Sequence, residues 1–125
     1  MSGTVKVAGL GFRTMADVAS LREALHLAGG ALGLSALATA EDKAGAPALF
    51  KLAAELGLPI IAVPLAQITI QIATPSRYVP ARYGALSLAE AAALAGAGPG
   101  ARLTSSRTVA GNKMATAAIA QNTHP

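Results

Sequence analysis

Short apolar segments alternate with amphipathic segments over the first half of the chain. Residues 5–10, 34–39 and 59–63 each have the length and apolar character of a buried strand. Between them, residues 18–28 and 47–56 carry apolar side chains at helical spacing. A strand, helix, strand, helix, strand series of this kind predicts parallel strands joined by helical crossovers.

Residues that start and stop helices mark the ends of these segments. Thr14 is a suitable N-cap for the first helix, with Asp17 three residues later. Gly29 and the glycine after it predict the end of that helix. Pro47 suits the first position of the second helix, and Gly57 predicts its end.

The second half begins with a segment that the pattern leaves open. Residues 65–73 fit neither the helical nor the strand period, and residues 74–77 have the composition of a loop. A helix is then predicted over 86–95. Ser87 caps it, and Glu90 completes a capping box.

The C-terminal region predicts a β-hairpin. Residues 102–109 and 114–120 are extended segments separated by a turn at 110–113, so they must run antiparallel. Residues 121–125 are expected to form a frayed tail. The fold class predicted for residues 1–125 is therefore α/β: a single domain with a mixed parallel and antiparallel sheet, flanking helices and a C-terminal β-hairpin.

The apolar residues are mostly small, and this affects both packing and location. They make up 53% of the chain, yet Trp is absent and only two Phe and two Tyr occur, which predicts closely packed backbones. The uncharged stretch over 56–73 is interrupted by Pro59 and Pro64, so we do not interpret it as a membrane helix. Without a signal-peptide pattern or any cysteine, the expected location is the cytoplasm.

The charge favours an anionic partner of small size. The net charge is +4, but only 13% of residues are charged and the bases are scattered along the chain. Proteins that bind nucleic acids concentrate Lys and Arg on one face and often add stacking aromatics, and neither feature occurs here. A small polycarboxylate or phosphorylated ligand suits dispersed bases better than a duplex does.

Gly9 and Gly11 follow the first apolar segment and suggest a tight turn before the first helix. The third glycine of a dinucleotide-binding motif is missing, because Thr14 stands at that position. Backbone amides near Arg13 and Thr14 are candidates to hold a carboxylate. The alternative is a plain turn in which Arg13 is solvated and Thr14 serves only as a cap.

A second candidate loop follows the second predicted strand. Thr39, Glu41 and Lys43 lie at the C-terminal end of that strand, the edge where open α/β sheets bind ligands. Lys43 suits an anionic substrate and Glu41 suits proton transfer. The alternative is that these residues form a solvated loop. Ser76 and Arg77 likewise belong either to a binding site or to a solvated loop. The two histidines are isolated, so we expect no metal site, and no motif implies a cofactor.

Five segments together resemble the CobE family of cobalamin biosynthesis, which is similar to the C-terminal domain of the cobalt-precorrin-5A hydrolase CbiG. They cover nearly the whole chain in the family's order, and the set is more specific than any single segment. One departure is Ala46, where the family pattern has a glutamate. The segments are residues 8–13, 38–43, 74–76, 84–94 and 115–120.

The resemblance implies a role in vitamin B12 synthesis. The full-length hydrolase opens a lactone on the corrin ring and releases acetaldehyde, and this chain corresponds only to its C-terminal part. The leading hypothesis is a domain that binds a precorrin; the alternatives are a hydrolase acting on a lactone-bearing precorrin and a structural partner of another pathway enzyme. The expected substrate-binding residues, from the loops and from the family pattern, are Gly9, Gly11, Arg13, Thr14, Thr39, Glu41, Lys43, Ser76, Arg77, Ser87 and Glu90.

Overall fold

The computed structural model describes residues 3–68 and 87–124. Within them the strands form one five-stranded sheet in the order β3-β2-β1-β5-β4. The predicted α/β fold with a mixed sheet and a C-terminal hairpin is confirmed. In chain order the main elements are β1 (Gly3–Phe12), α1 (Val18–Ala28), β2 (Ala36–Ala40), α2 (Pro47–Leu56), β3 (Ile60–Val63), α4 (Leu88–Ala97), β4 (Arg102–Val109) and β5 (Ala115–His124).

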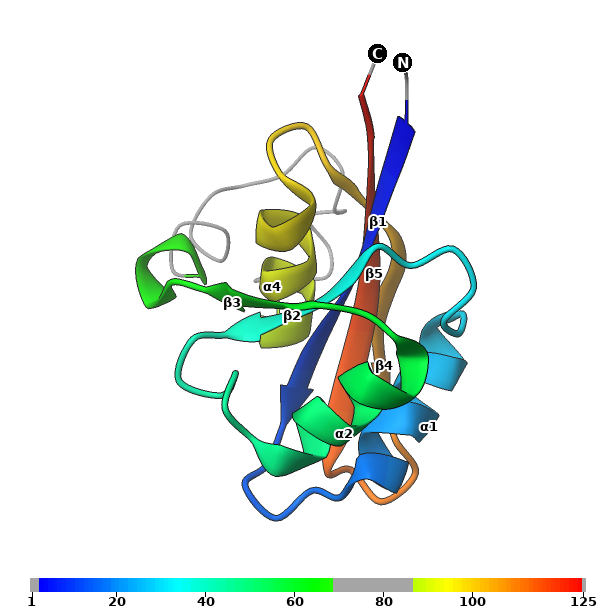
Figure 1. Cartoon of the computed structure of the whole chain (residues 1–125), viewed down its shortest axis with the longest axis vertical. Helices are drawn as coiled ribbons and strands as arrows, with labels where there is room; N and C mark the ends of the chain where they lie inside the picture. The colour runs from blue at the N-terminus through cyan, green and yellow to red at the C-terminus, as the bar shows by residue number, and fades with distance from the viewer. Residues whose placement is uncertain (1–2, 69–86, 125) are drawn as a thin grey trace.

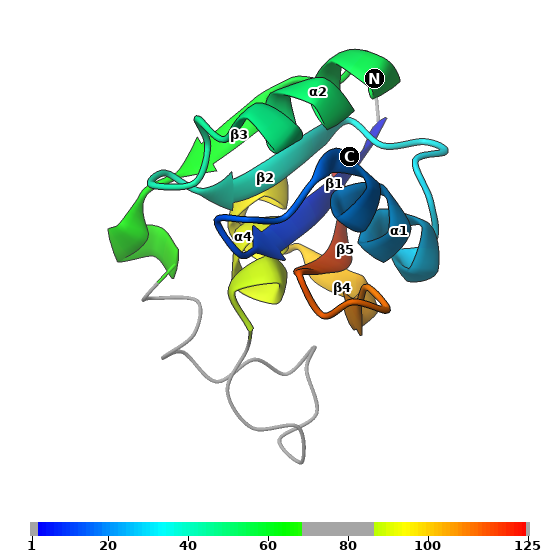
Figure 2. The ribbon, with the colours of Figure 1, turned by 90° about the horizontal axis from the view of Figure 1, so that it is seen from below.

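Helices cover both faces of the sheet. Figures 1 and 2 show α1 and α2 on one face and α4 on the other. Leucines of α1 and α2 pack against one face, in a core cluster that includes Leu10, Leu37 and Ile119. The α4 side is built from smaller residues, with the alanines of α4 packed against Val7 and Ala38. The alanine-rich composition therefore gives one side of the sheet a thin, close-packed layer.

The strand directions bring several loops to one edge of the sheet. β1 pairs with β2 in parallel, and β2 pairs with β3 in parallel. The C-terminal ends of these strands consequently emerge at the same edge, which the arrowheads of β1 and β2 indicate in Figure 1. β5 lies between β1 and β4 and is antiparallel to both, so the turn before β5 reaches this edge as well.

β1 is longer than predicted, and the expected tight turn at Gly9 and Gly11 is wrong. Both glycines lie inside the strand and pair with β5, Gly9 with Ala118 and Gly11 with Thr116. A Cβ atom at Gly9 would lie 2.0 Å from the carbonyl oxygen of Ala89 in α4. The glycines therefore allow α4 to approach the sheet closely. In the sequence, glycines with this packing role look the same as glycines of a turn.

Most helix boundaries follow the predicted signals. Gly57 ends α2 in the left-handed conformation, with Pro47 at the start of that helix. The Ser87–Glu90 capping box is confirmed, and the helix it begins runs over 88–97. Thr14 is not the cap of α1: Asp17 is, because its extended backbone and carboxylate satisfy the amide of Ser20.

The expected frayed tail begins later than predicted. β5 continues to His124, which pairs with Gly3 of β1, so the two ends of the described chain lie side by side (Figure 1). Residues 65–68, part of the segment that the pattern left open, form a helical turn. Across residues 3–68 and 87–124, none of the helices has the length and apolar character needed to cross a membrane.

Candidate functional site

The C-terminal ends of the parallel strands bring two of the three predicted basic residues, Arg13 and Lys43, to one edge of the sheet. Phe12 ends β1, and the Nζ atom of Lys43 lies 5.7 Å from the centroid of its ring. Arg13 is the next residue and is exposed. A cation at this distance from an aromatic ring is attracted by the negative ring face, so Phe12 helps to hold the Lys43 loop against β1.

Arg13 is positioned by its backbone. Its amide donates to the carbonyl oxygen of Met114 at 2.9 Å, and its own carbonyl accepts from Ala16 at 3.0 Å. Residues 13–16 are therefore a closed turn tied to the turn that precedes β5. Thr14 lies exposed in this turn, next to Met15, whose side chain is 83% exposed. The loop presents a cation and an apolar side chain together.

Glu41 anchors the second loop. Its amide donates to the carbonyl oxygen of Val63 at 2.9 Å. Its carboxylate accepts from the amide of Leu65 at 2.8 Å. The side chain expected to move a proton thus joins the end of β2 to the segment that follows β3.

Three of the predicted residues are buried parts of the sheet. Thr39 is 0% exposed, and its hydroxyl donates to the carbonyl oxygen of Leu10 at 2.7 Å, which links β2 to β1. Gly9 and Gly11 are buried where α4 crosses β1. These three support the edge from within, and none of them presents a side chain to solvent.

The N-terminus of α4 reaches the same edge. A Cβ at Gly11 would lie 3.4 Å from Cδ2 of Leu88 and 3.8 Å from the amide nitrogen of Ala89. The Ser87 amide donates to Glu90 at 2.9 Å, and the Glu90 amide donates to the Ser87 hydroxyl at 3.2 Å. Both side chains are used by the helix cap, which stabilises the helix without a ligand. Ser76 and Arg77 lie outside the described residues.

The turn between β4 and β5 is a part of the edge that the sequence prediction missed. It carries Lys113, an exposed residue with a φ of 62°. Asn112 in the same turn donates to the Ser20 hydroxyl at 2.7 Å, and that hydroxyl donates to Asp17 at 2.8 Å. The two hydrogen bonds from Ser20 hold the pKa of the Asp17 carboxyl below its usual value. The sequence predicted that β5 pairs with β4 in a hairpin, but it did not predict that β5 also pairs with β1.

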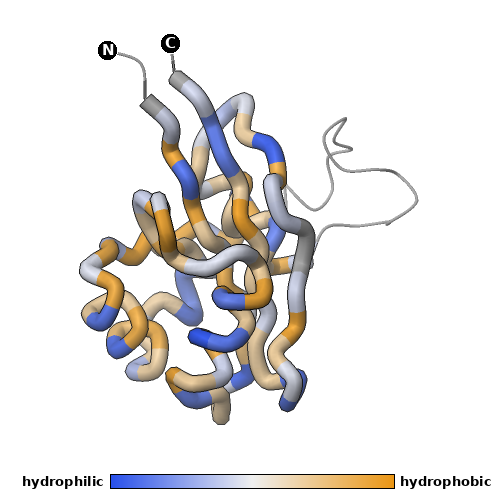
Figure 3. Tube along the Cα trace, turned by 90° about the vertical axis from the view of Figure 1, so that its right-hand side faces the viewer, coloured by the Kyte–Doolittle hydropathy of each residue, from blue (hydrophilic) through white to orange (hydrophobic). Residues whose placement is uncertain are grey.

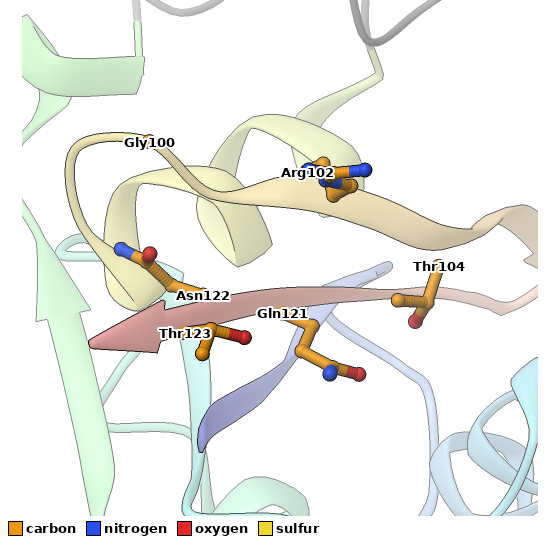
Figure 4. Close-up of a pocket in the computed structure, with 6 residues that line it drawn as sticks. All are labelled: Gly100, Arg102, Thr104, Gln121, Asn122 and Thr123. Carbon is orange, nitrogen blue, oxygen red and sulfur yellow. The ribbon is translucent and has the colours of Figure 1, made fainter. Parts of the chain in front are cut away.

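A polar hollow lies elsewhere on the molecule. It has a volume of about 280 Å³ and is lined by the residues labelled in Figure 4, among them Arg102, Gln121 and Asn122. Gln121 pairs with Lys6, far from the end of β1, and Figure 3 shows hydrophilic segments of the strands near both chain ends. The loops that carry Arg13 and Lys43 are therefore at the opposite end of the sheet from this hollow. The part of the chain that the structure describes has no group of three or more acidic, His or Cys side chains able to hold a metal ion.

The family model described as "Cobalamin synthesis G C-terminus" matches residues 6–120. The chain belongs to this family. A cobalamin biosynthesis protein chiG from Agrobacterium tumefaciens strain C58 is 38% identical and superposes with a TM-score of 0.75, over 93% of this chain and 97% of that one. CobE, a protein from the cobalamin (vitamin B12) biosynthetic pathway, is 30% identical with a TM-score of 0.70, over 98% of this chain and 94% of that one. No curated protein matches the chain.

The match to the cobalamin synthesis family confirms the resemblance seen in the sequence. It covers most of β1, most of β5 and every described element between them. The basic edge around Phe12, Arg13 and Lys43 falls within the matched residues.

Proposed function

We propose that this chain binds a corrinoid intermediate at the edge formed by the ends of β1, β2 and β3. The observation that carries the proposal is the position of Lys43 over the ring of Phe12, the residue before Arg13 in the chain. Cations from two different loops thus lie at the same edge of the sheet, in a member of a cobalamin synthesis family. Precorrins carry acetate and propionate carboxylates around the ring, which are the groups that Arg and Lys bind.

The affinity in this proposal comes from several weak contacts. An exposed ion pair contributes only about 0.2 to 1 kcal/mol, so neither cation is sufficient alone. Met15 is 83% exposed and Leu65 is 48% exposed, and both follow strands that end at this edge. Apolar side chains beside cations suit an amphipathic ligand, whose ring is apolar and whose rim is charged.

Binding is the form of the function that the geometry favours. Glu41, the acid expected to transfer a proton, accepts a hydrogen bond from the Leu65 amide and anchors its loop. A hydrolase acting on a lactone-bearing precorrin and a structural partner of another pathway enzyme are the alternatives. We place the binding step in the cytoplasm, with the ligand passed to or from another enzyme of the pathway.

Titration of the purified protein with cobyrinic acid, followed by absorbance, tests the proposal. Cobyrinic acid has a corrin ring with free carboxylates, and cobinamide has a closely similar ring whose side chains are amides. We expect saturable binding of cobyrinic acid at low salt, weaker binding in high salt, and much weaker binding of cobinamide. Equal binding of the two rings would contradict recognition through the carboxylates, and no binding of either would favour the structural-partner alternative. Turnover of a lactone-bearing precorrin would identify a hydrolase.

A further inference from the structure

We infer that Lys113 is a third anion-binding residue of this edge, supplied by the turn between β4 and β5. The inference rests on the proposed function for the identity of the ligand, but its geometry is independent of it. The Arg13 amide donates to the carbonyl oxygen of Met114, the residue after Lys113. Phe12 pairs with Ala115 at the start of β5. Lys113 therefore lies within a few residues of the Arg13–Met114 contact, at the same edge as Lys43.

The turn is held in place by contacts with α1. The Gly111 amide donates to the Glu23 carboxylate. The Asn112 side chain donates to the hydroxyl of Ser20, a residue that is 4% exposed. The Met114 amide donates to Asn112 Oδ1 at 3.0 Å. Lys113 thus extends from a fixed turn, so less backbone freedom is lost when it binds a ligand.

The backbone of Lys113 has an unusual conformation for its residue type. Its φ is 62°, and it is the only non-glycine residue with a positive φ among those that the structure describes. Glycine or asparagine fits this conformation at less cost than a residue with a long side chain. The turn conformation therefore does not explain why this residue is a lysine. Compared with glycine or asparagine, the lysine contributes an exposed ammonium group at this position.

The acidic residues near this edge are mostly engaged by backbone amides. Asp17 accepts from Ser20, Glu23 from Gly111, and Glu41 from Leu65. Asp42 is exposed. The ion pair found among the described residues joins Arg22 to Glu55 and does not involve this edge.

With Asp17, Glu23 and Glu41 bound to amides, the three cations are available to an external anion. Arg13, Lys43 and Lys113 come from three separate loops. A ligand with several carboxylates spread around a ring can contact all three at once, whereas a single carboxylate cannot. The chemical class that fits is a polycarboxylate with an apolar body, as the proposed function requires.

The test compares Lys113→Gly with Lys113→Arg. Glycine relieves the positive φ while removing the charge, so Lys113→Gly is expected to unfold at the same temperature as the parent or higher. It should bind cobyrinic acid about two- to fivefold more weakly at low salt, the range of one exposed ion pair. Lys113→Arg should keep the parent affinity. Lys6→Ala is the control, because it removes a lysine roughly 20 Å along β1 from Arg13.

A second probe separates this inference from the proposed function. Tricarballylate has several carboxylates but no ring. Its binding is followed by NMR, through changes in the backbone amide chemical shifts of residues 13–15, 41–44 and 111–114. Shifts in all three loops of the parent, with the 111–114 shifts lost in Lys113→Gly, support the inference even if corrins do not bind. Cobyrinic acid bound equally well by the parent and by Lys113→Gly would overturn it while the proposed function stands. Shifts confined to other parts of the chain would overturn it as well.

Discussion

Gly9 of β1 lies against Ala89 of α4 so closely that a Cβ at Gly9 would be 2.0 Å from the Ala89 carbonyl oxygen. The same Cβ would be 2.5 Å from the amide nitrogen of Ala93. Both atoms belong to the helix backbone, so no side-chain rotation can make room. This contact sets the distance of α4 from the sheet and so the position of the α4 N-terminus at the edge where β1 and β2 end.

The first prediction follows from this contact. Gly9→Ala should destabilise the protein by about 3 kcal/mol or more, because the helix must move away from the sheet. Gly45→Ala is the matched control, since a Cβ there meets nothing within 4 Å and its φ is not positive. Urea unfolding of the two variants measures the difference. Equal midpoints for both variants would contradict the close packing of α4.

The second prediction concerns the buried hydroxyl of Thr39. Thr39→Val keeps the side-chain volume but leaves the Leu10 carbonyl without its 2.7 Å hydrogen bond. We expect a loss of about 1 to 3 kcal/mol in the free energy of unfolding. Thr104→Val is the control, because the exposed Thr104 hydroxyl makes a longer bond of 3.3 Å and its loss should cost little. If the two variants lost the same stability, Thr39 would not link β1 to β2 in the way described.

The third prediction concerns pH and the cap of α1. Hydrogen bonds from Ser20 hold the pKa of Asp17 below its usual 3.8. Because the folded pKa is depressed, the stabilisation is present above the unfolded pKa and is lost as the pH falls through the folded value. Ser20→Ala should raise the Asp17 pKa toward 3.8. The free energy of unfolding of the variant should therefore lie closer to that of the parent in acid than at neutral pH.

An NMR titration of the Asp17 side-chain carboxyl carbon in the parent and in Ser20→Ala measures this shift. The backbone amide of residue 20 still donates in the variant, so part of the depression should remain. An unchanged pKa in Ser20→Ala would show that the hydroxyl is not its main cause.

Local sequence signals predicted the features that depend on neighbouring residues. The Ser87–Glu90 capping box and the Pro47 and Gly57 ends of α2 formed as expected. These devices need only a few consecutive residues, so their chemistry is visible in the sequence.

Most of the features that were missed depend on distant residues; the local exception is the cap of α1, which is Asp17 and not Thr14. Gly9 and Gly11 resembled a turn because their partner is α4, about eighty residues later in the chain. Their spacing of two, opposite an alanine-rich helix, was the available signal. Lys113 was missed because its position at the edge depends on the pairing of β5 with β1. The hairpin signal in the sequence specifies only the pairing of β5 with β4, its neighbour in the chain.

We propose that Arg13 and Lys43 bind the carboxylates of a corrinoid. The most direct test is to measure the affinity for cobyrinic acid of a double variant that combines Arg13→Ala with Lys43→Ala. At low salt the double variant should bind roughly tenfold more weakly or worse, with a smaller loss at high salt where the ion pairs are screened. Its folding should change little, since Arg13 is exposed and Lys43 is partly exposed on a loop. A double variant that folds and binds cobyrinic acid at low salt as tightly as the parent would contradict the account.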